Sequence, residues 1–268
     1  MKERNDACTV VPYPRTRLIM VDGGRLGLKR HTIHGLIEFD ITDARESLRR
    51  HRKETGEALS FLAFFLACLG KAIDQNKEMH ACRNWHRQMV IYDEVDVNML
   101  FEVEVDGEKI IRPHIFRGVN KLSIREIHEE IRSFQDQHES SEEAKFIVWF
   151  ERLPGFLRRL LLKVLLRTPR LVKDFYGTVM VSSIGMFGSG SGWGIPVPNH
   201  SLQLTLGGIC DKPGVVDHRI EVRKYMSVTI SLDHDVIDGA PAARFINRLK
   251  SLVEAGYNLQ EIGDSIPK

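Results

Sequence analysis

Two stretches of the chain alternate hydrophobic and polar residues, which is typical of a β-strand with one buried face. The first covers residues 33–41, and the second covers residues 95–105 and ends at Asp106-Gly107. Glycine tolerates the positive φ of a tight hairpin turn, so residues 110–115 are predicted to form the returning strand. Further strands are predicted at residues 88–92, 178–182, 201–209 and 224–232.

Two helices are predicted directly after the first strand. Thr42 and Asp43 offer N-caps to a charged helix that ends at Gly56. Ser60 is a candidate cap for an apolar helix within residues 58–73. That helix is apolar all round, so it is predicted to be buried.

The remaining helices follow the same periodicity. Ser123-Ile124-Arg125-Glu126 fits a capping box, and apolar residues recur after it at helical spacing through Phe134. A leucine-rich basic helix is predicted over residues 156–166, and a last helix over residues 241–255. Residues 1–30 show no clear period and are predicted to form an irregular N-terminal arm with room for one short element.

The mixture of strands and amphipathic helices predicts an α/β layer fold. The 268 residues are enough for one large domain with a substantial core. Because no internal repeat or linker divides the chain, residues 31–268 are predicted to form a single domain after the arm.

Composition narrows the possible partners and compartments. The formal net charge is only +2, so no nucleic-acid partner is expected. The cysteines lack CxxC spacing, so they suggest neither a zinc site nor a disulfide framework, and reduced thiols are expected. Residues 58–73 are shorter than the roughly 20 apolar residues that cross a bilayer. With no transmembrane segment and no export signal expected, a cytoplasmic location is the expectation. The cysteines are Cys8, Cys68, Cys82 and Cys210.

The first candidate for chemistry is the pattern His234-x-x-x-Asp238-Gly239, between the predicted strand 224–232 and the last helix. Strand ends in α/β proteins hold side chains rigidly and leave them accessible. Histidine suits base catalysis because its ordinary pKa of about 6.5 lies near neutrality. Asp238 can orient neighbouring groups, and Gly239 permits a tight turn. On spacing alone, a surface or core histidine is the ordinary alternative, since the chain has 11 histidines.

The second candidate lies in residues 177–188, where a β-branched strand ends at Ser182-Ser183 before a glycine-punctuated turn. A serine hydroxyl at such a strand end can donate a hydrogen bond to a developing oxyanion. A serine-rich turn without chemistry is the alternative interpretation.

Together these segments resemble the catalytic domain of the 2-oxoacid dehydrogenase dihydrolipoamide acyltransferases. Residues 229–245 resemble the C-terminal signature of that family, and residues 177–188 resemble its strand and GMFG segment. The other predicted elements follow the order of the family, so the resemblance runs from about residue 33 to the C-terminus. It implies a chloramphenicol acetyltransferase-like fold, a two-layer mixed β-sheet with flanking helices.

The resemblance implies a role for each matched residue. His234 matches the general base that takes the proton from the thiol of coenzyme A or of the acceptor. Ser182 matches the hydroxyl that stabilises the tetrahedral oxyanion, and Asp238 matches a structural carboxylate. The acyl group is expected to pass directly between coenzyme A, a substrate, and a thiol such as a dihydrolipoyl group. Family members form homotrimers and larger symmetric cages, so His234 and Ser182 are expected from different chains.

The chain departs from the family pattern in four respects. Asp235 follows the histidine where the family usually has a basic residue, and Ser183 stands where asparagine is common. The basic leucine-rich segment 149–176 has no recognised counterpart. The 268 residues leave no room for lipoyl or peripheral-subunit-binding domains. A lipoylated protein is therefore expected to act in trans, with no lipoyl group attached to this chain.

Three functions stay open at this point. The first is a coenzyme-A-dependent acyltransferase, and the second is a structural or cage-forming homologue with altered chemistry. The third is a chloramphenicol-acetyltransferase-like O-acyltransferase with a small hydroxylated acceptor. Thermal stabilisation by coenzyme A distinguishes the second function from the other two.

Two further segments have more than one interpretation. Residues 185–194 are glycine-rich, but no Lys-Ser/Thr pair and no helix follow them, so a wall of the acyl pocket fits better than a nucleotide site. The basic helix at residues 156–170 has an ordinary solvated face as its first interpretation. The alternatives are attraction of the coenzyme A phosphates and contact with an anionic membrane or partner. The scattered histidines indicate no metal site.

Overall fold

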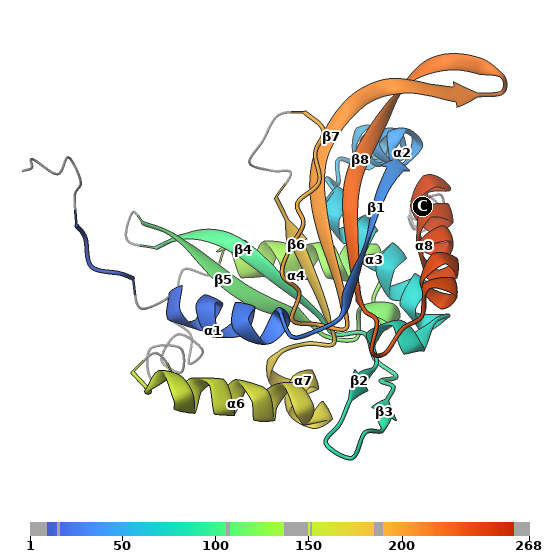
Figure 1. Ribbon diagram of the computed structural model, residues 1–268. Helices are drawn as coiled ribbons and strands as arrows, with labels where there is room; N and C mark the ends of the chain where they lie inside the picture. The colour runs from blue at the N-terminus through green and yellow to red at the C-terminus, as the bar shows by residue number, and fades with distance from the viewer. Residues whose placement is uncertain are drawn as a thin grey trace, which may run out of the picture.

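The computed structural model describes residues 10–14, 17–105, 108–136, 150, 152–184 and 190–259, without the side chains of residues 103–105 and 108–111. Its centre is a six-stranded mixed sheet with strand order β1-β8-β7-β6-β4-β5 (Figure 1). β6 runs parallel to both of its neighbours, and the other pairs are antiparallel. The strands are β1 (Thr32–Asp40), β4 (Val97–Val105), β5 (Glu108–Phe116), β6 (Val179–Ser183), β7 (Leu202–Val216) and β8 (Arg219–Asp233).

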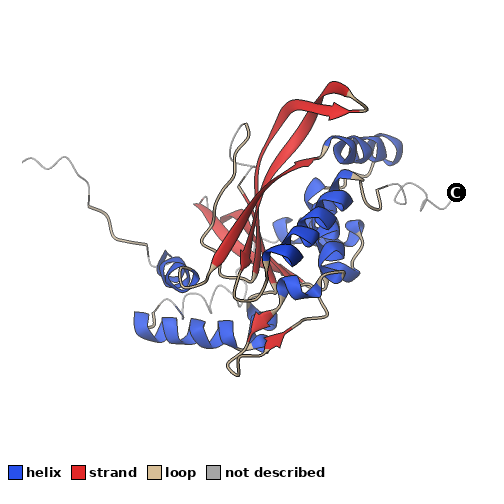
Figure 2. Ribbon diagram, turned by 45° about the vertical axis from the view of Figure 1, so that its right-hand side comes forward, coloured by secondary structure: helices blue, strands red, loops and turns tan. Residues whose placement is uncertain are grey.

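Helices lie on both sides of this sheet. The first set, at the right of the sheet in Figure 2, comprises α2 (Thr42–Thr55), α3 (Phe61–Asp74), α4 (Ile124–Asp136) and α8 (Gly239–Glu254). The second set, below the sheet in Figure 1, comprises α1 (Arg17–Gly27), α6 (Gly155–Arg167) and α7 (Pro169–Phe175). The small elements are the two-stranded sheet of β2 (Cys82–Arg83) with β3 (Met89–Val90) and the 3-10 turns η1 (Lys77–His80) and η2 (Val119–Lys121).

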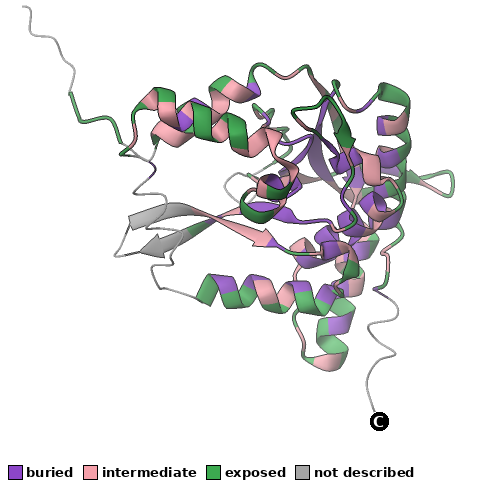
Figure 3. Ribbon diagram, turned by 90° about the horizontal axis from the view of Figure 1, so that it is seen from below, coloured by how far each residue is buried: buried purple, intermediate pink, exposed green. Residues whose placement is uncertain are grey.

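The core forms between the sheet and the first set of helices, where Figure 3 shows the buried residues concentrated. α3 lies at its centre with Phe64 and Phe65 fully buried, and the ring of Phe65 meets that of Phe39 edge to face with centroids 6.1 Å apart. Alternate residues of β7 and β8 complete it with aliphatic side chains. These are Leu202, Leu204, Leu206, Val228, Ile230 and Leu232.

The opposite face of β7 and β8 carries buried polar side chains, among them Thr205 and Thr229. Residues 190–199 cross this face so closely that only glycine fits beneath them. A Cβ on Gly207 would lie 2.1 Å from the carbonyl oxygen of Gly192, and one on Gly208 would lie 2.0 Å from that of Gly190. The sheet is therefore covered on both faces near its centre.

The predicted fold class, a mixed sheet with flanking helices, is confirmed. The capping box of α4 is present, since the Ser123 amide donates to Glu126 at 2.7 Å and the Glu126 amide donates to the Ser123 hydroxyl at 3.2 Å. Ser60 caps α3 through the amide of Ala63, and Gly56 ends α2 in the left-handed conformation. The predicted Asp106-Gly107 turn lies outside the described residues.

Other local predictions were wrong. Ile41 rather than Thr42 is the N-cap of α2, because the Thr42 hydroxyl bonds instead to the Asp40 carboxylate at 2.6 Å. The irregular arm contains a full helix, α1. β7 and β8 extend well past the predicted ends and form a projecting hairpin, whose turn places Asp217 and His218 at positive φ. Most residues of this arm are exposed, so it contributes little to the core.

No helix in the described part of the chain is long and apolar enough to cross a membrane. This finding agrees with the burial of α3, the most apolar helix, in the core.

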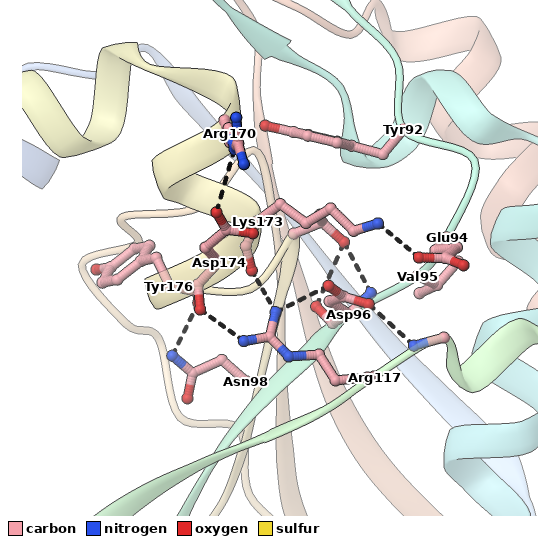
Figure 4. Close-up of polar contacts among 12 residues, drawn as sticks. Tyr92, Glu94, Val95, Asp96, Asn98, Arg117, Arg170, Lys173, Asp174 and Tyr176 are labelled. Atoms are coloured by element: carbon pink, nitrogen blue, oxygen red, sulfur yellow. Dashed lines mark hydrogen bonds and ion pairs between the residues drawn. The ribbon is translucent and has the colours of Figure 1, made fainter. Parts of the chain in front are cut away.

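A buried carboxylate joins the second set of helices to the sheet (Figure 4). Asp96, only 1% exposed, lies just before β4 and accepts hydrogen bonds from Arg117 at 2.9 Å and from the Gly118 amide at 2.9 Å. The same guanidinium group donates to the backbone carbonyls of Lys173 and Asp174 at the end of α7. Cations at a helix C-terminus satisfy carbonyls that have no partner within the helix. One ion pair thus fixes where α7 ends.

We expect Arg117→Met to lower the free energy of unfolding by about 2–4 kcal/mol, because it leaves the buried Asp96 carboxylate without its counter-charge. Urea denaturation measures the change. Lys121→Met is the matched control, since it removes a cation from an exposed pair with Glu94 and should cost about 1 kcal/mol or less. Equal losses in the two variants would show that Asp96 and Arg117 do not form the proposed anchor.

Candidate functional site

His234 follows the last residue of β8 and is exposed. Its amide donates to the carbonyl of His31 at 2.7 Å, which continues the pairing of β8 with β1. The preceding residue, Asp233, is buried and forms an ion pair with Arg30 at 2.5 Å. The backbone at His234 is therefore held from two sides while the imidazole stays accessible, as a base requires.

Asp235, the acidic residue where a basic one is usual, has cationic partners. Its carboxylate lies 2.8 Å from Nδ1 of His31 and 3.8 Å from the guanidinium group of Arg83. The hydrogen bond to His31 holds the pKa of Asp235 below its usual range, and the same bond raises the pKa of His31. The negative charge beside His234 is thus largely matched by neighbouring positive groups.

Asp238 is the N-cap residue of α8 and is exposed. Its backbone is extended, and its carbonyl accepts the first helical hydrogen bond, from Ala242 at 3.1 Å. The carboxylate makes no capping hydrogen bond. The carboxylate therefore lies near the positive, N-terminal end of the helix dipole but does not cap the helix.

Ser182 is half-buried in β6, next to Val181, which is in the core. Since successive strand residues point to opposite faces, Ser182 points away from the core helices. It pairs in register with Thr205 of β7, which pairs with Thr229 of β8. A row of three hydroxyl-bearing residues therefore crosses the sheet. In the part of the chain that the structure describes, the buried hydroxyls of Thr205 and Thr229 have no hydrogen-bond partner.

The register keeps Ser182 and His234 apart within one chain. Ser182 is level with Thr229, and His234 lies five positions further along β8. At about 3.3 Å per residue this separation is roughly 16 Å along the strand, and two strand spacings of about 4.8 Å are added across the sheet. Hydrogen-bond reach is about 3 Å. The two predicted catalytic residues therefore lie toward opposite ends of the strands. They cannot act together within a single protomer.

A buried polar cluster behind the His234 segment was missed by the sequence interpretation. A small cavity there is lined by side chains that include Arg30, His80, Cys82, Tyr92, Tyr176 and His200. The scattered positions of these residues in the sequence gave no motif. The only sequence signal for this cluster was weak. Each of its two histidines has a small or polar residue beside it.

Both histidines of the cluster are neutral in their surroundings. Burial lowers the pKa of His80 and that of His200 to about 4 in each case. His80 is held by Thr178 at 2.9 Å and the carbonyl of Tyr92 at 3.1 Å. His200 stacks on the ring of Tyr176, with centroids 4.3 Å apart. Within the described ranges, no group of three or more His, Cys, Asp or Glu residues is placed to hold a metal ion.

The family model of the 2-oxoacid dehydrogenases acyltransferase (catalytic domain) matches residues 37–144 and 171–261. The chain therefore belongs to this family. The match is interrupted between residues 144 and 171, a gap that contains α6.

Curated relatives agree with this assignment. The human mitochondrial dihydrolipoyllysine-residue succinyltransferase component of the 2-oxoglutarate dehydrogenase complex is 25% identical over 222 residues, which cover 81% of this chain and 42% of the relative. The lipoamide acyltransferase component of the Bacillus subtilis branched-chain alpha-keto acid dehydrogenase complex is 25% identical over 227 residues, covering 82% and 46%. The chain thus spans less than half the length of these relatives. Both are named as acyltransferases, which are transferases.

Solved structures share the fold. A probable dihydrolipoamide acetyltransferase from Listeria monocytogenes aligns with a TM-score of 0.69 at 18% identity, covering 93% of this chain and 96% of that one. The Azotobacter vinelandii dihydrolipoamide acetyltransferase aligns with a TM-score of 0.68 at 17% identity, covering 97% and 98%. That structure was solved to investigate a serine, a histidine and an asparagine in its catalytic mechanism.

The buried histidines predict a loss of stability in mild acid. Below pH 6.5 the unfolded chain takes up protons on His80 and His200, whereas the folded chain does not until about pH 4. Because the unfolded state binds more protons in this window, the free energy of unfolding falls as the pH is lowered from 7 to 5, by about 2 kcal/mol for each histidine. The exposed His31, whose pKa is raised, acts weakly in the opposite direction.

Urea denaturation at pH 7 and pH 5 measures this difference. His200→Gln should reduce it by about 2 kcal/mol, since one of the two deeply buried histidines is removed. His86→Gln, at an exposed position, should leave it unchanged. A native protein equally stable at the two pH values would contradict the assignment of two buried neutral histidines.

Proposed function

We propose that this chain transfers an acyl group between coenzyme A and a thiol such as a dihydrolipoyl group, with His234 as the general base. The observation that carries the proposal is His234 itself. It is an exposed imidazole on a backbone held by Arg30–Asp233 and by the carbonyl of His31, in a chain of the acyltransferase family. Ser182 is proposed as the donor to the oxyanion, and Asp238 as the structural carboxylate.

The proposed reaction is a direct transfer. His234 takes the proton of the acceptor thiol, and the thiolate forms a bond to the carbonyl carbon of the acyl-coenzyme A. The Ser182 hydroxyl donates a hydrogen bond to the resulting oxyanion. The bond to the coenzyme A sulfur then breaks, and the coenzyme A thiolate takes the proton back from His234. No acyl group is attached to the protein at any step.

The proposal requires a second copy of the chain. Since Ser182 and His234 are roughly 16 Å apart along the strands of one protomer, the site is completed only when Ser182 of one copy faces His234 of another. A homotrimer, alone or in a larger symmetric cage, repeats this arrangement at each interface. The cubic core of the pyruvate dehydrogenase multienzyme complex has the same fold, with a TM-score of 0.68, and supports such an assembly for this chain.

A second candidate function is structural, and Asp235 is the observation that favours it. A carboxylate beside the base would raise the cost of forming a thiolate nearby. The contacts of Asp235 with His31 and Arg83 reduce this cost, because they balance its charge. We therefore place the enzymatic function first, with a lipoylated protein as the partner that supplies the thiol.

An acyl-transfer assay with acetyl-coenzyme A and dihydrolipoamide tests the proposal. His234→Ala should lower kcat by about two to four orders of magnitude through loss of the base. Ser182→Ala should lower it by about two orders of magnitude, because the oxyanion loses a donor. His86→Ala, an exposed histidine outside the site, should keep native activity.

Each other outcome selects a different function. Native activity in His234→Ala would refute the site. Absence of any thermal stabilisation by coenzyme A would refute the enzymatic function and leave the structural one. Transfer to small hydroxylated acceptors but not to dihydrolipoamide would indicate an O-acyltransferase of the chloramphenicol acetyltransferase type.

A further inference from the structure

Helix α6 presents an apolar face to solvent. Phe156, Leu160 and Val164 are 68%, 53% and 36% exposed, respectively. They are four residues apart, so at 3.6 residues per turn they lie along one side of the helix. A soluble helix ordinarily turns such a stripe toward the core. Here the stripe lies on the outside.

The inner side of α6 explains why the helix cannot rotate to bury that stripe. Arg158 is buried against α1, where its guanidinium group meets Asp22 at 2.8 Å, and Arg159 reaches the same carboxylate at 3.2 Å. Asp22 is itself 1% exposed. Removing a partner from a buried pair of this kind costs several kcal/mol, so the orientation of the helix is fixed.

Positive charge is interleaved with the apolar stripe. Lys163 and Arg167 lie within the same arc of the helix as Leu160, and among the described residues neither forms an ion pair. Lys163 is exposed, and Arg167 lies with its guanidinium carbon 6.0 Å from the ring centre of Trp85. α6 itself contains no acidic residue.

Aromatic side chains lie at both ends of this surface. Trp85, on the turn between β2 and β3, is 49% exposed, and its ring nitrogen lies 3.5 Å from the Thr168 hydroxyl that follows α6. Phe156 lies at the other end. Figure 1 places α6, α7 and the β2–β3 turn together along the lower edge of the molecule. We name the set Phe156, Leu160, Lys163, Val164, Arg167 and Trp85 the α6 surface.

We propose that the α6 surface docks on an anionic lipid bilayer, with the helix lying in the plane of the membrane surface. Tryptophan, phenylalanine and leucine combined with unpaired Lys and Arg are the composition of interfacial helices. Lys163 and Arg167 supply the attraction to anionic headgroups, and each such cation contributes modestly to binding. A single helix that projects from the surface can dock on a partner without a complementary groove. A lipid bilayer is a partner of this kind.

The position of α6 in the chain agrees with a function added to the common fold. The helix falls in the interval between residues 144 and 171, which the family model does not match. α7 follows it and is tied to the sheet by Arg117, so the helix is carried on a rigid base.

Vesicle flotation of the full chain tests the proposal. We expect binding to vesicles of phosphatidylcholine with 30% phosphatidylglycerol, and at least tenfold weaker binding to phosphatidylcholine alone or at high salt. Phe156→Ser with Leu160→Ser should weaken binding by about tenfold or more, because two apolar groups no longer insert. Lys163→Glu should weaken it by a smaller factor. Ile220→Ser is the matched control, since Ile220 is an 80% exposed residue on the distant hairpin.

Several results would overturn the proposal. One is the absence of binding to anionic vesicles at low salt, and another is equal weakening by Ile220→Ser. A change in oligomeric state in the Phe156→Ser, Leu160→Ser variant, without vesicle binding of the native chain, would assign the surface to a second copy. Tighter binding to polyglutamate than to vesicles would assign it to an acidic protein partner. Circular dichroism and acyl transfer of the variants confirm that they are folded.

Discussion

The hydrogen-bond register of the central sheet is the constraint on which the functional account depends. β6 runs parallel to β7, and β8 returns antiparallel. The C-terminal ends of β6 and β8 therefore lie at opposite ends of the sheet along the strand direction. Ser182 and His234 each lie at one of these ends. A slip of register by one residue would move every side chain to the other face and is excluded by the aliphatic core. The distance between the two residues is therefore a fixed property of the fold, and the proposed site needs two copies of the chain.

Polar contacts hold one end of this sheet in place. Arg30–Asp233 and the carbonyl of His31 support the backbone at His234. Near the start of β4, Asp96 and Arg117 attach α7, and the buried histidines His80 and His200 fill the space between. These groups are costly to bury and are all partnered on at least one side. They give the accessible imidazole of His234 a rigid support, which the proposed base needs in order to meet a group from another subunit.

The sequence predicted the regular part of the fold well and the irregular part poorly. Alternation identified β1 and β4, and cap chemistry located α3 and α4, because each of these signals lies within a contiguous segment of the chain. The hairpin beyond Ile209 was missed because its arm projects from the sheet (Figure 1) and leaves most of its residues exposed, among them Ile220 and Val222. α1 was missed because its packing partner is α6, distant in the sequence.

The candidate site also has one part that the sequence predicted and another that it did not. His234, Ser182 and Asp238 were found as motifs, since each is part of a contiguous segment. The pairing of Asp235 with His31 joins residues that are far apart in sequence, so only the three-dimensional structure reveals it. The same is true of the cavity with His80 and His200, whose histidines have no sequence spacing in common. The separation of Ser182 from His234 follows from strand pairing, which sequence periodicity does not determine.

Subunit complementation tests the central claim most directly. His234→Ala and Ser182→Ala are each expected to be nearly inactive alone, but co-expression forms mixed assemblies. In these, some interfaces join the native Ser182 of one variant to the native His234 of the other. If each site draws on two adjacent copies, random mixing restores about one quarter of native acyl transfer. If the mixed assemblies are no more active than either variant alone, the two residues do not meet between subunits, and the account of the site is wrong.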